Sequence, residues 1–221
     1  MEEEIYYLKY KKYYKKYINL KNKISLNKII GGGERIKITL EKVKLEHSKY
    51  LLPIVSDINI MKYIKKGKIW SEKELNERLK WYERHWKNIK NSKYFYWVIK
   101  VKSEYLEETK LPISEDGYIY IGLIGFHKSN ELKKYDSKLN NNFYLTIFLD
   151  TSVHGKGIGS IALKKSISKM NKLLPKLDSV YSLAVDYNMG SQKISEKVGF
   201  KKINDNIKIN NNNYILYQYK F

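Results

Sequence analysis

The chain of 221 residues has no cysteine, few prolines and few arginines. The absence of cysteine excludes disulfide bonds, zinc sites built on thiolates and a cysteine nucleophile. No apolar run approaches the ~20 residues that span a bilayer, and the acidic start Met1–Glu4 is unlike the basic beginning of a secretory signal peptide. We therefore expect a soluble, cytoplasmic protein.

Acidic residues are scarce beside basic ones. The chain has 43 lysines and arginines against 23 aspartates and glutamates, a formal net charge of +20. Nearly all of the excess is lysine, which lacks the bidentate fork with which arginine reads guanine or clamps phosphate. Two interpretations stay open. The lysines are either solvated surface residues or the footprint of a polyanion, such as a nucleic acid, an anionic surface or a phosphorylated cofactor.

The first 33 residues differ in composition from the rest. Residues 5–28 contain eight lysines and six tyrosines but no acidic residue, and several of the tyrosines recur at helical spacing. This pattern predicts either a helix whose tyrosines pack on the protein body or a basic aromatic arm for RNA, a membrane or a partner. Because Gly31–Gly33 is a flexible joint, we expect a basic extension at 1–33 and a folded domain at 34–221.

Beyond residue 34 the hydrophobic pattern changes between strand and helix periods. Strands are expected at 35–40, 94–101, 118–126, 143–149, 180–185, 200–208 and 213–220. Helices are expected as short pieces between 47 and 64, broken by Pro53, and then at 72–89, 158–174 and 191–198. Ser71 and Glu74 form a capping-box pattern, and Gly199 is a typical helix stop.

A glycine-rich turn follows the strand that ends at Leu149. Gly155, Gly157 and Gly159 precede the next helix, and glycine permits positive φ angles and close backbone approach. Successive amides can then converge on an anion at the positive end of the helix, and pyrophosphate is the obvious ligand; alternatively, the glycines serve only the geometry of the turn. The spacing fits neither a nucleotide P-loop, because a glycine follows Lys156, nor the Gly-x-Gly-x-x-Gly dinucleotide fingerprint.

Two segments carry a resemblance to a known family. Residues 154–159 read His-Gly-Lys-Gly-Ile-Gly, and residues 188–200 read Asn-Met-Gly-Ser-Gln-Lys-Ile-Ser-Glu-Lys-Val-Gly-Phe. The first resembles the Gln/Arg-x-x-Gly-x-Gly/Ala signature of the GNAT superfamily, the acetyl-CoA-dependent N-acetyltransferases, with His154 in place of Gln or Arg. The second resembles the Asn-x-x-Ser…Glu-Lys-x-Gly-Phe block of the ribosomal-protein N-terminal (Rim-type) branch.

The resemblance covers residues 34–204 and implies an α+β fold. Its expected form is a mixed, mainly antiparallel sheet of six to seven strands, flanked by about four helices and splayed at the central strands. It also implies acetyl-CoA as cosubstrate, no metal, and a primary amine as acceptor.

The resemblance further implies a set of cofactor contacts. The pantetheine arm would hydrogen-bond to the backbones of Ile147 and Leu149, and the Asn188 side chain would contact that arm or a nearby water. The pyrophosphate would lie on six consecutive amides next to His154, those of Gly155, Lys156, Gly157, Ile158, Gly159 and Ser160. Structural explanations stay open, because the strand residues also fit a core and Asn188 fits a helix cap.

The implied reaction is direct attack of a neutral amine on the thioester, with a backbone amide near Leu149 stabilising the developing oxyanion. Many relatives protonate the leaving thiolate with a tyrosine seven residues after the asparagine, where this chain has Ser195. We nominate Ser191 as the donor and Tyr187 as the second candidate, although Ser191 also fits a helix N-cap.

The general base and the acceptor are less specified. Asp150 or His127 can relay a proton through water, but both residue types are common in turns and at surfaces, and we assign no base. A protein α-amine with a pKa of ~8 needs less help than a lysine of ~10.4, which favours a protein N-terminus or a similarly acidic small amine. Alternatives are an amino sugar, a nucleotide-linked sugar or a polyamine, or a non-catalytic basic module that binds nucleic acid.

Overall fold

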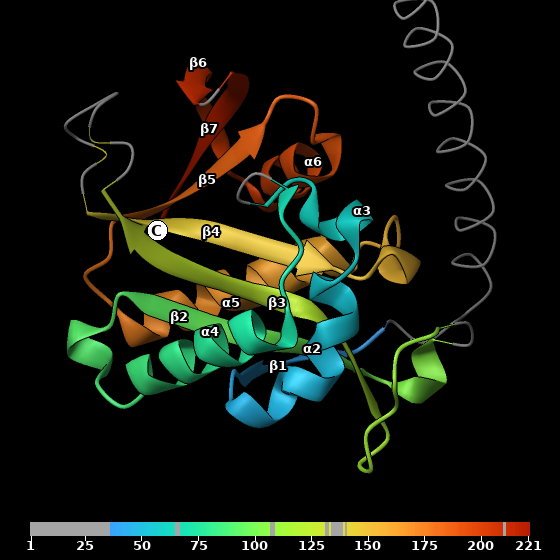
Figure 1. Cartoon of the computed structure of the whole chain (residues 1–221). Helices are drawn as coiled ribbons and strands as arrows, with labels where there is room; N and C mark the ends of the chain where they lie inside the picture. Colours follow the sequence, from blue (N-terminus) through green and yellow to red (C-terminus); the bar gives the residue numbers. More distant parts are fainter. Residues whose placement is uncertain are drawn as a thin grey trace, which may run out of the picture. The chain divides into compact units, whose positions relative to one another are not determined.

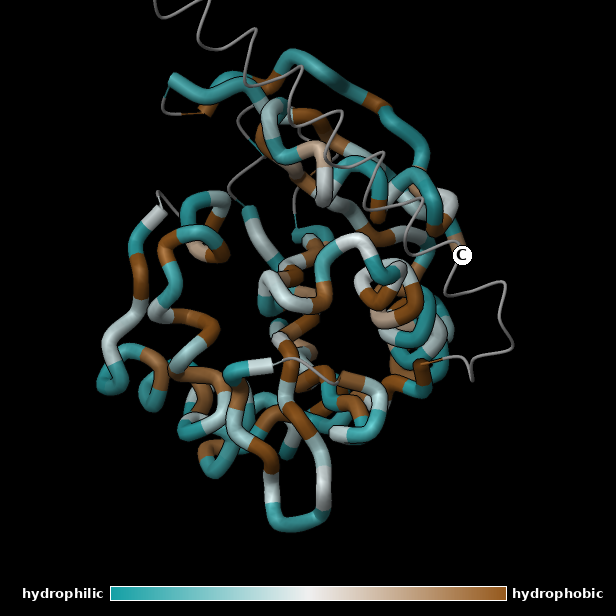
Figure 2. Tube along the Cα trace, turned by 90° about the vertical axis from the view of Figure 1, so that its right-hand side faces the viewer, coloured by the Kyte–Doolittle hydropathy of each residue, from teal (hydrophilic) through white to brown (hydrophobic). Residues whose placement is uncertain are grey.

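A computed structural model describes residues 36–64, 67–106, 109–130, 133, 139, 141–209 and 211–221. The interpretations of residues 5–28 lie outside these residues. Residues Lys37–Phe221 form one compact unit. Along its strands and helices, hydrophobic and hydrophilic residues alternate in short stretches (Figure 2), as expected for elements with one buried side.

A seven-stranded sheet forms the centre of this unit (Figure 1), in the order β1-β2-β3-β4-β5-β7-β6. Neighbouring strands are antiparallel except β4 and β5, which are parallel. The strands are β1 (Ile38–Lys42), β2 (Tyr94–Lys102), β3 (Tyr118–Ser129), β4 (Asn142–Leu149), β5 (Ser179–Val185), β6 (Lys201–Ile209) and β7 (Asn212–Lys220). The mixed, mainly antiparallel sheet expected from the sequence is confirmed.

Helices cover both faces of the sheet. In Figure 1, α4 lies in front of the strands and α5 behind them. The five α-helices of the described residues are α2 (Ser48–Val55), α3 (Ile58–Met61), α4 (Glu72–His85), α5 (Ile158–Leu173) and α6 (Met189–Val198); single 3-10 turns are η1 (Leu45–His47), η3 (Ile89–Asn91), η4 (Ser103–Tyr105) and η6 (Thr151–Val153). None of the helices in the described ranges is long and apolar enough to cross a membrane.

Two boundaries near the start of the domain differ from the prediction. The first strand begins at Ile38, later than the predicted 35–40. Pro53 does not break the helix but lies inside α2, which ends two residues later at Val55. Proline leaves one helical hydrogen bond unmade, and a new helix begins after Asp57, whose side chain accepts the Asn59 N–H at 2.8 Å.

The predicted capping box opens α4. Glu74 N–H donates to Ser71 Oγ at 3.2 Å, and Ser71 N–H donates to Glu74 Oε2 at 3.0 Å. The helix ends at His85, four residues before the predicted end, because Trp86 leaves the helix as its C-cap. Trp86 instead donates its indole N–H to the Tyr96 carbonyl of β2 at 3.2 Å, which anchors the end of α4 to the sheet.

Candidate functional site

The central strands β4 and β5 separate soon after they meet. They are in register at one residue pair, Tyr144 with Tyr181, whereas β4 continues to Leu149. On its other side β4 pairs with β3 along its whole length, from Asn142 to Leu149. The carboxyl half of β4 is therefore paired on one edge only, which confirms the splay expected at the central strands.

The orientation of the β4 backbone follows from the bond that leaves its end. Asp150 N–H donates to the Ile121 carbonyl of β3 at 2.8 Å. Because the polar groups of successive residues in an antiparallel strand alternate between its two edges, those of Ile147 and Leu149 point away from β3 and toward the splay. These are the backbone groups predicted to hold the pantetheine arm.

The glycine turn after β4 is open where an anion would bind. Gly155 and Gly157 each have φ of +75°, and a Cβ added to either would meet no atom within 4 Å. Gly157 is the N-cap of α5 and has no side-chain cap, and the first helical bond runs from Ile161 N–H to the Gly157 carbonyl at 3.2 Å. The amides of residues 158–160 precede that bond, so they have no acceptor within the helix and lie at its positive end.

Gly159 has a different role from the other two glycines. A Cβ at this position would lie 2.6 Å from Ile194 Cδ1 and 3.3 Å from Leu149 Cδ1. The missing side chain therefore lets α5 approach α6 and the end of β4. Two glycines open the turn, and the third brings the surrounding elements together.

His154, at the departure from the family signature, closes the turn onto the strand. Its Nε2 lies 3.1 Å from the Leu149 carbonyl oxygen, five residues earlier in the chain. Since a carbonyl only accepts, the neutral or charged imidazole donates from Nε2. This bond connects the end of β4 to the beginning of the glycine turn, while Lys156 next to it is exposed.

The start of α6 resolves which residue caps that helix. Asn188 is the N-cap, and its Oδ1 accepts the Ser191 N–H at 3.1 Å. The cap explanation of Asn188 therefore holds, and its amide nitrogen is the group that remains to contact a ligand. Ser191 is the third residue of α6 and not its cap, so its hydroxyl is not used for that purpose.

Ser195, at the usual tyrosine position, is completely buried. Its hydroxyl donates to Ser182 Oγ of β5 at 3.1 Å, which ties α6 to the sheet. Tyr187 is 53% exposed and its ring centroid lies 5.9 Å from that of Tyr63. The pKa of Tyr214 is raised, first by burial and to a smaller extent by the neighbouring Tyr187.

The two residues considered for proton relay have well-defined contacts. His127 Nδ1 lies 3.2 Å from the Tyr96 hydroxyl and 3.4 Å from Thr146 Oγ1. Burial raises the pKa of Tyr96 well above its usual value, so this phenol stays neutral. Asp150 caps a 3-10 turn through the Ser152 N–H at 2.9 Å, which matches the turn explanation.

Sequence reasoning missed Gly122 of β3, which is opposite Leu149. A Cβ at this position would lie 2.3 Å from the Phe148 carbonyl oxygen. The glycine therefore lets β3 approach the end of β4 and helps to fix the strand edge described above. A glycine inside an apolar strand pattern is the sequence signal that indicates such an approach.

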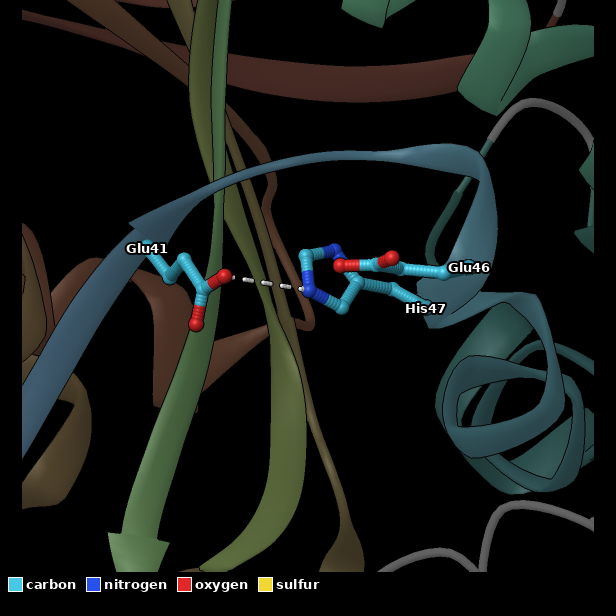
Figure 3. A group of neighbouring side chains, drawn as sticks. All are labelled: Glu41, Glu46 and His47. Carbon is cyan, nitrogen blue, oxygen red and sulfur yellow. Dashed lines mark ion pairs between the residues drawn. The ribbon is translucent and has the colours of Figure 1, made fainter. Parts of the chain in front are cut away.

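Glu41, Glu46 and His47 bring three possible metal ligands within 4.8 Å of one another (Figure 3). Two ammonium groups are already there: Lys100 Nζ lies 2.8 Å from Glu41 Oε2, and Lys44 Nζ lies 3.1 Å from Glu46 Oε1. His47 Nδ1 accepts the Lys44 N–H at 3.0 Å. These contacts explain the cluster as an ion-pair network between β1, η1 and β2.

Comparison with known families identifies the class of protein. A family model described as an acetyltransferase (GNAT) domain matches residues 37–201. The chain therefore belongs to the GNAT acetyltransferases, and it is an acyltransferase that transfers an acetyl group from acetyl-CoA to an amine. Comparison with curated proteins gave no significant match.

Solved structures share the fold at low sequence identity. A GNAT-family acetyltransferase from Bacillus anthracis is 19% identical, with 84% of this chain and 96% of that chain covered and a TM-score of 0.55. The ribosomal-protein-S5-alanine acetyltransferase from Vibrio fischeri is 17% identical, with 85% and 94% covered and a TM-score of 0.59. Spermidine N-acetyltransferase from Vibrio cholerae, in complex with CoA and spermine, is 16% identical, with 83% and 95% covered and a TM-score of 0.57.

Proposed function

We propose that the chain acetylates the α-amine of a protein N-terminus or a similar small primary amine, in the manner of the Rim-type branch. The observation that supports this proposal is the free edge of β4, which leads directly into an open glycine turn at the start of α5. A carrier whose pantetheine arm leads to a pyrophosphate fits this combination. The strand edge offers backbone groups to the arm, and the start of the helix then offers amides to the pyrophosphate.

In this proposal each cofactor contact has a defined partner. Bound acetyl-CoA supplies the activated acetyl group. The Ile147 backbone and the Leu149 N–H align the pantetheine arm, since the Leu149 carbonyl is bonded to His154, and the amides of residues 155–160 hold the pyrophosphate. His154 keeps the turn attached to the Leu149 carbonyl, so the two binding elements stay in a constant relative position. Such alignment of two reactants is worth a large part of the rate, with effective molarities of roughly 10⁵ M or more.

The catalytic assignment favours Ser191 over position 195. The buried Ser195 hydroxyl is committed to Ser182, whereas Ser191 is half-buried in the first turn of α6, the helix that follows β5. We propose that the Ser191 hydroxyl donates a proton or hydrogen bond to the leaving thiolate, and Tyr187 remains the second candidate. A backbone amide at the end of β4, near Leu149, is the proposed donor to the oxyanion.

The fold leaves the choice of acceptor open, because its solved relatives include enzymes named for a ribosomal protein and for spermidine. A polyamine acceptor needs carboxylates to match its several charges, and the chain is strongly basic. This contrast supports an α-amine. Amino sugars and nucleotide-linked sugars remain alternatives that an acceptor panel separates.

The cofactor part of the proposal is tested by Gly157→Glu. The new carboxylate would occupy the open space of the turn and repel a pyrophosphate, so calorimetry should show CoA affinity falling by about 100-fold or more. Gly117→Glu is a matched control. Gly117 has a φ of +73° and equally open surroundings, but it belongs to a different turn, directly before β3. Equal CoA affinity in the two variants would contradict the proposed cradle.

The transfer step is tested by thiol release from acetyl-CoA with a panel of acceptors. The panel contains short peptides with free N-termini, spermidine, glucosamine and a nucleotide-linked amino sugar. Release should be fastest with a peptide. Saturable CoA binding together with release only in the presence of a polyamine or a sugar would replace the α-amine by that acceptor.

A further inference from the structure

Exposed apolar side chains gather in the two segments beside the open end of β4. Among the described residues, ten large hydrophobic side chains are exposed. Five of them belong to residues 58–69 or 187–189, namely Ile58, Tyr63, Ile69, Tyr187 and Met189. Apolar surface concentrated in this way on a folded domain usually marks a binding surface.

Two of these side chains connect the segments across the splay. The Tyr63 and Tyr187 ring centroids lie 5.9 Å apart with an interplanar angle of 44°. Tyr63 follows α3, and Tyr187 lies between β5 and α6. The pair therefore joins the segment after α3 to the end of β5, the strand that diverges from β4.

This aromatic pair lies on the acceptor side of the sheet. Trp70, at the end of the same segment as Tyr63, packs edge-on against Phe148 of β4 with a centroid distance of 5.8 Å. The next residue, Leu149, faces α5 through Gly159, so Phe148 and the Trp70 ring lie on the opposite face from α5. In the proposed function the cofactor cradle begins α5, which leaves this opposite face for the amine.

The chemistry of these segments selects among acceptors. The described residues of 58–69 and 187–189 include no carboxylate, and Asp57 and Asp186 only flank these segments. Asp57 accepts both N–H groups of Asn59 at 2.8 and 3.1 Å, and the nearby Glu74 is paired with Lys68 Nζ at 2.9 Å. Lys62 Nζ lies 5.1 Å from the Tyr63 ring centroid. A polyamine would meet few unpaired negative groups here, and the exposed aliphatic side chains of Ile58, Ile69 and Met189 offer no hydrogen-bond partner to the hydroxyls of a sugar.

We propose that Tyr63 and Tyr187 bind the apolar side chain next to the acceptor amine. This inference rests on the proposed function and names its substrate class, a polypeptide whose first residue is a large apolar or aromatic one. Two half-exposed aromatic rings offer such a side chain extensive contact, and the same two segments also expose Ile58 and Met189.

The test uses peptides that differ only in the first residue, either Phe or Ser. The full-length chain should acetylate the Phe peptide with a kcat/KM about 10-fold or more above that for the Ser peptide. Tyr63→Ala should raise KM for the Phe peptide about 10-fold, with kcat, CoA affinity and the rate with the Ser peptide unchanged. Tyr63→Phe should retain the preference, because the ring and not the hydroxyl makes the contact.

Trp81→Ala is the matched control, because Trp81 is 47% exposed on α4 and contacts His85 and Tyr94 instead of the aromatic pair. It should leave the preference intact. Equal rates with the two peptides, or a Tyr63→Ala variant that keeps the full preference, would overturn the inference while CoA binding and transfer to the Ser peptide still support the proposed function. Absence of both CoA binding and transfer would remove the proposed function and the inference together.

Discussion

Ser191 and Ser195 lie about one turn apart on α6, yet their surroundings give them different tasks. Ser195 is inaccessible and bonded to Ser182 in the sheet. Ser191 contributes its N–H to the Asn188 cap and is half-buried. A helix repeats every 3.6 residues, so the two positions share a face, and the depth of packing along that face separates an accessible hydroxyl from a structural one.

Ser191→Ala should lower kcat by about 100-fold, which is the lower end of the range for loss of a proton donor. CoA affinity should stay unchanged, because the variant keeps the backbone and the cap. Steady-state kinetics and calorimetry measure the two effects. An unchanged kcat in Ser191→Ala combined with a large loss in Tyr187→Phe would transfer the role to the tyrosine.

Ser195→Ala provides the matched comparison on the same helix. It removes the hydrogen bond to Ser182 and leaves that hydroxyl without its partner, so the free energy of unfolding should fall by about 1–3 kcal/mol. The kcat should remain close to that of the unmodified chain. Denaturant unfolding with parallel kinetics checks both results.

At the scale of elements, the end of β4 is positioned by glycine on two sides. Gly122 of β3 lets the neighbouring backbone come close, and Gly159 of α5 leaves room for Leu149 and Ile194. Between these contacts, the Asp150 N–H bond to Ile121 orients the strand so that its free edge faces the splay. The free edge of β4 therefore depends on residues of the neighbouring strand and helix.

Gly122→Ala should disturb this edge. The added methyl would overlap the Phe148 carbonyl, so β3 and β4 must move apart, at a cost of about 1–3 kcal/mol in unfolding free energy, and CoA affinity should fall as well. In Gly117→Ala the positive φ costs about 1–2 kcal/mol, but CoA affinity should not change. Full CoA affinity in Gly122→Ala would show that the strand edge tolerates the displacement.

At the scale of the whole molecule, the ion-pair network at β1 makes stability depend on pH. Burial lowers the pKa of His47, and the negative charges of Glu41 and Glu46 raise it by less than burial lowers it. Burial raises the pKa of Glu41. The hydrogen bond and charge of Lys100, together with the charges of His47 and Lys44, lower it by more, so the net shift is downward. Both groups therefore bind protons more weakly in the folded chain than in the unfolded chain.

The free energy of unfolding should consequently decrease in two successive windows as the pH is lowered. Below pH 6.5, the reference pKa of histidine, the unfolded chain takes up a proton before the folded chain does, so the free energy of unfolding decreases as the pH falls. Below the Glu41 reference pKa of 4.5, the carboxylate contribution is lost as well. His47→Asn, which retains an acceptor for the Lys44 N–H, should be less stable at pH 7 but should flatten the first window. An unchanged slope between pH 6.5 and 5 in chemical unfolding would contradict this assignment.

The basic composition outside the described domain carries a separate prediction. If residues 1–33 form an arm for nucleic acid, the full chain should bind RNA with an affinity that falls steeply as salt increases. Deletion of residues 1–33 should abolish this binding while CoA affinity remains. Absent or salt-insensitive RNA binding would assign the lysines to a solvated surface instead, and salt-sensitive binding that survives the deletion would place the RNA site outside residues 1–33.

Local chemistry in the sequence determined the element pattern and the position of the glycine turn. Side-chain periodicity located the seven strands to within a few residues, because alternation along a strand is a local property. The Ser71–Glu74 box and the Gly199 stop were equally local. Pro53 and the end of α4 were placed wrongly, because tertiary packing keeps a helix through a proline and draws Trp86 toward β2.

Only the tertiary structure decided how these pieces form a site. The point at which β4 leaves β5 depends on the pairing of Tyr144 with Tyr181, the burial of Ser195 depends on β5, and the Tyr63–Tyr187 contact joins segments more than a hundred residues apart. Each of these contacts is made between segments that no local pattern relates, since its energy exists only after the sheet has assembled. The glycine turn was therefore readable from the residues themselves and the splay only through the family resemblance, whereas the contact between Tyr63 and Tyr187 came from neither.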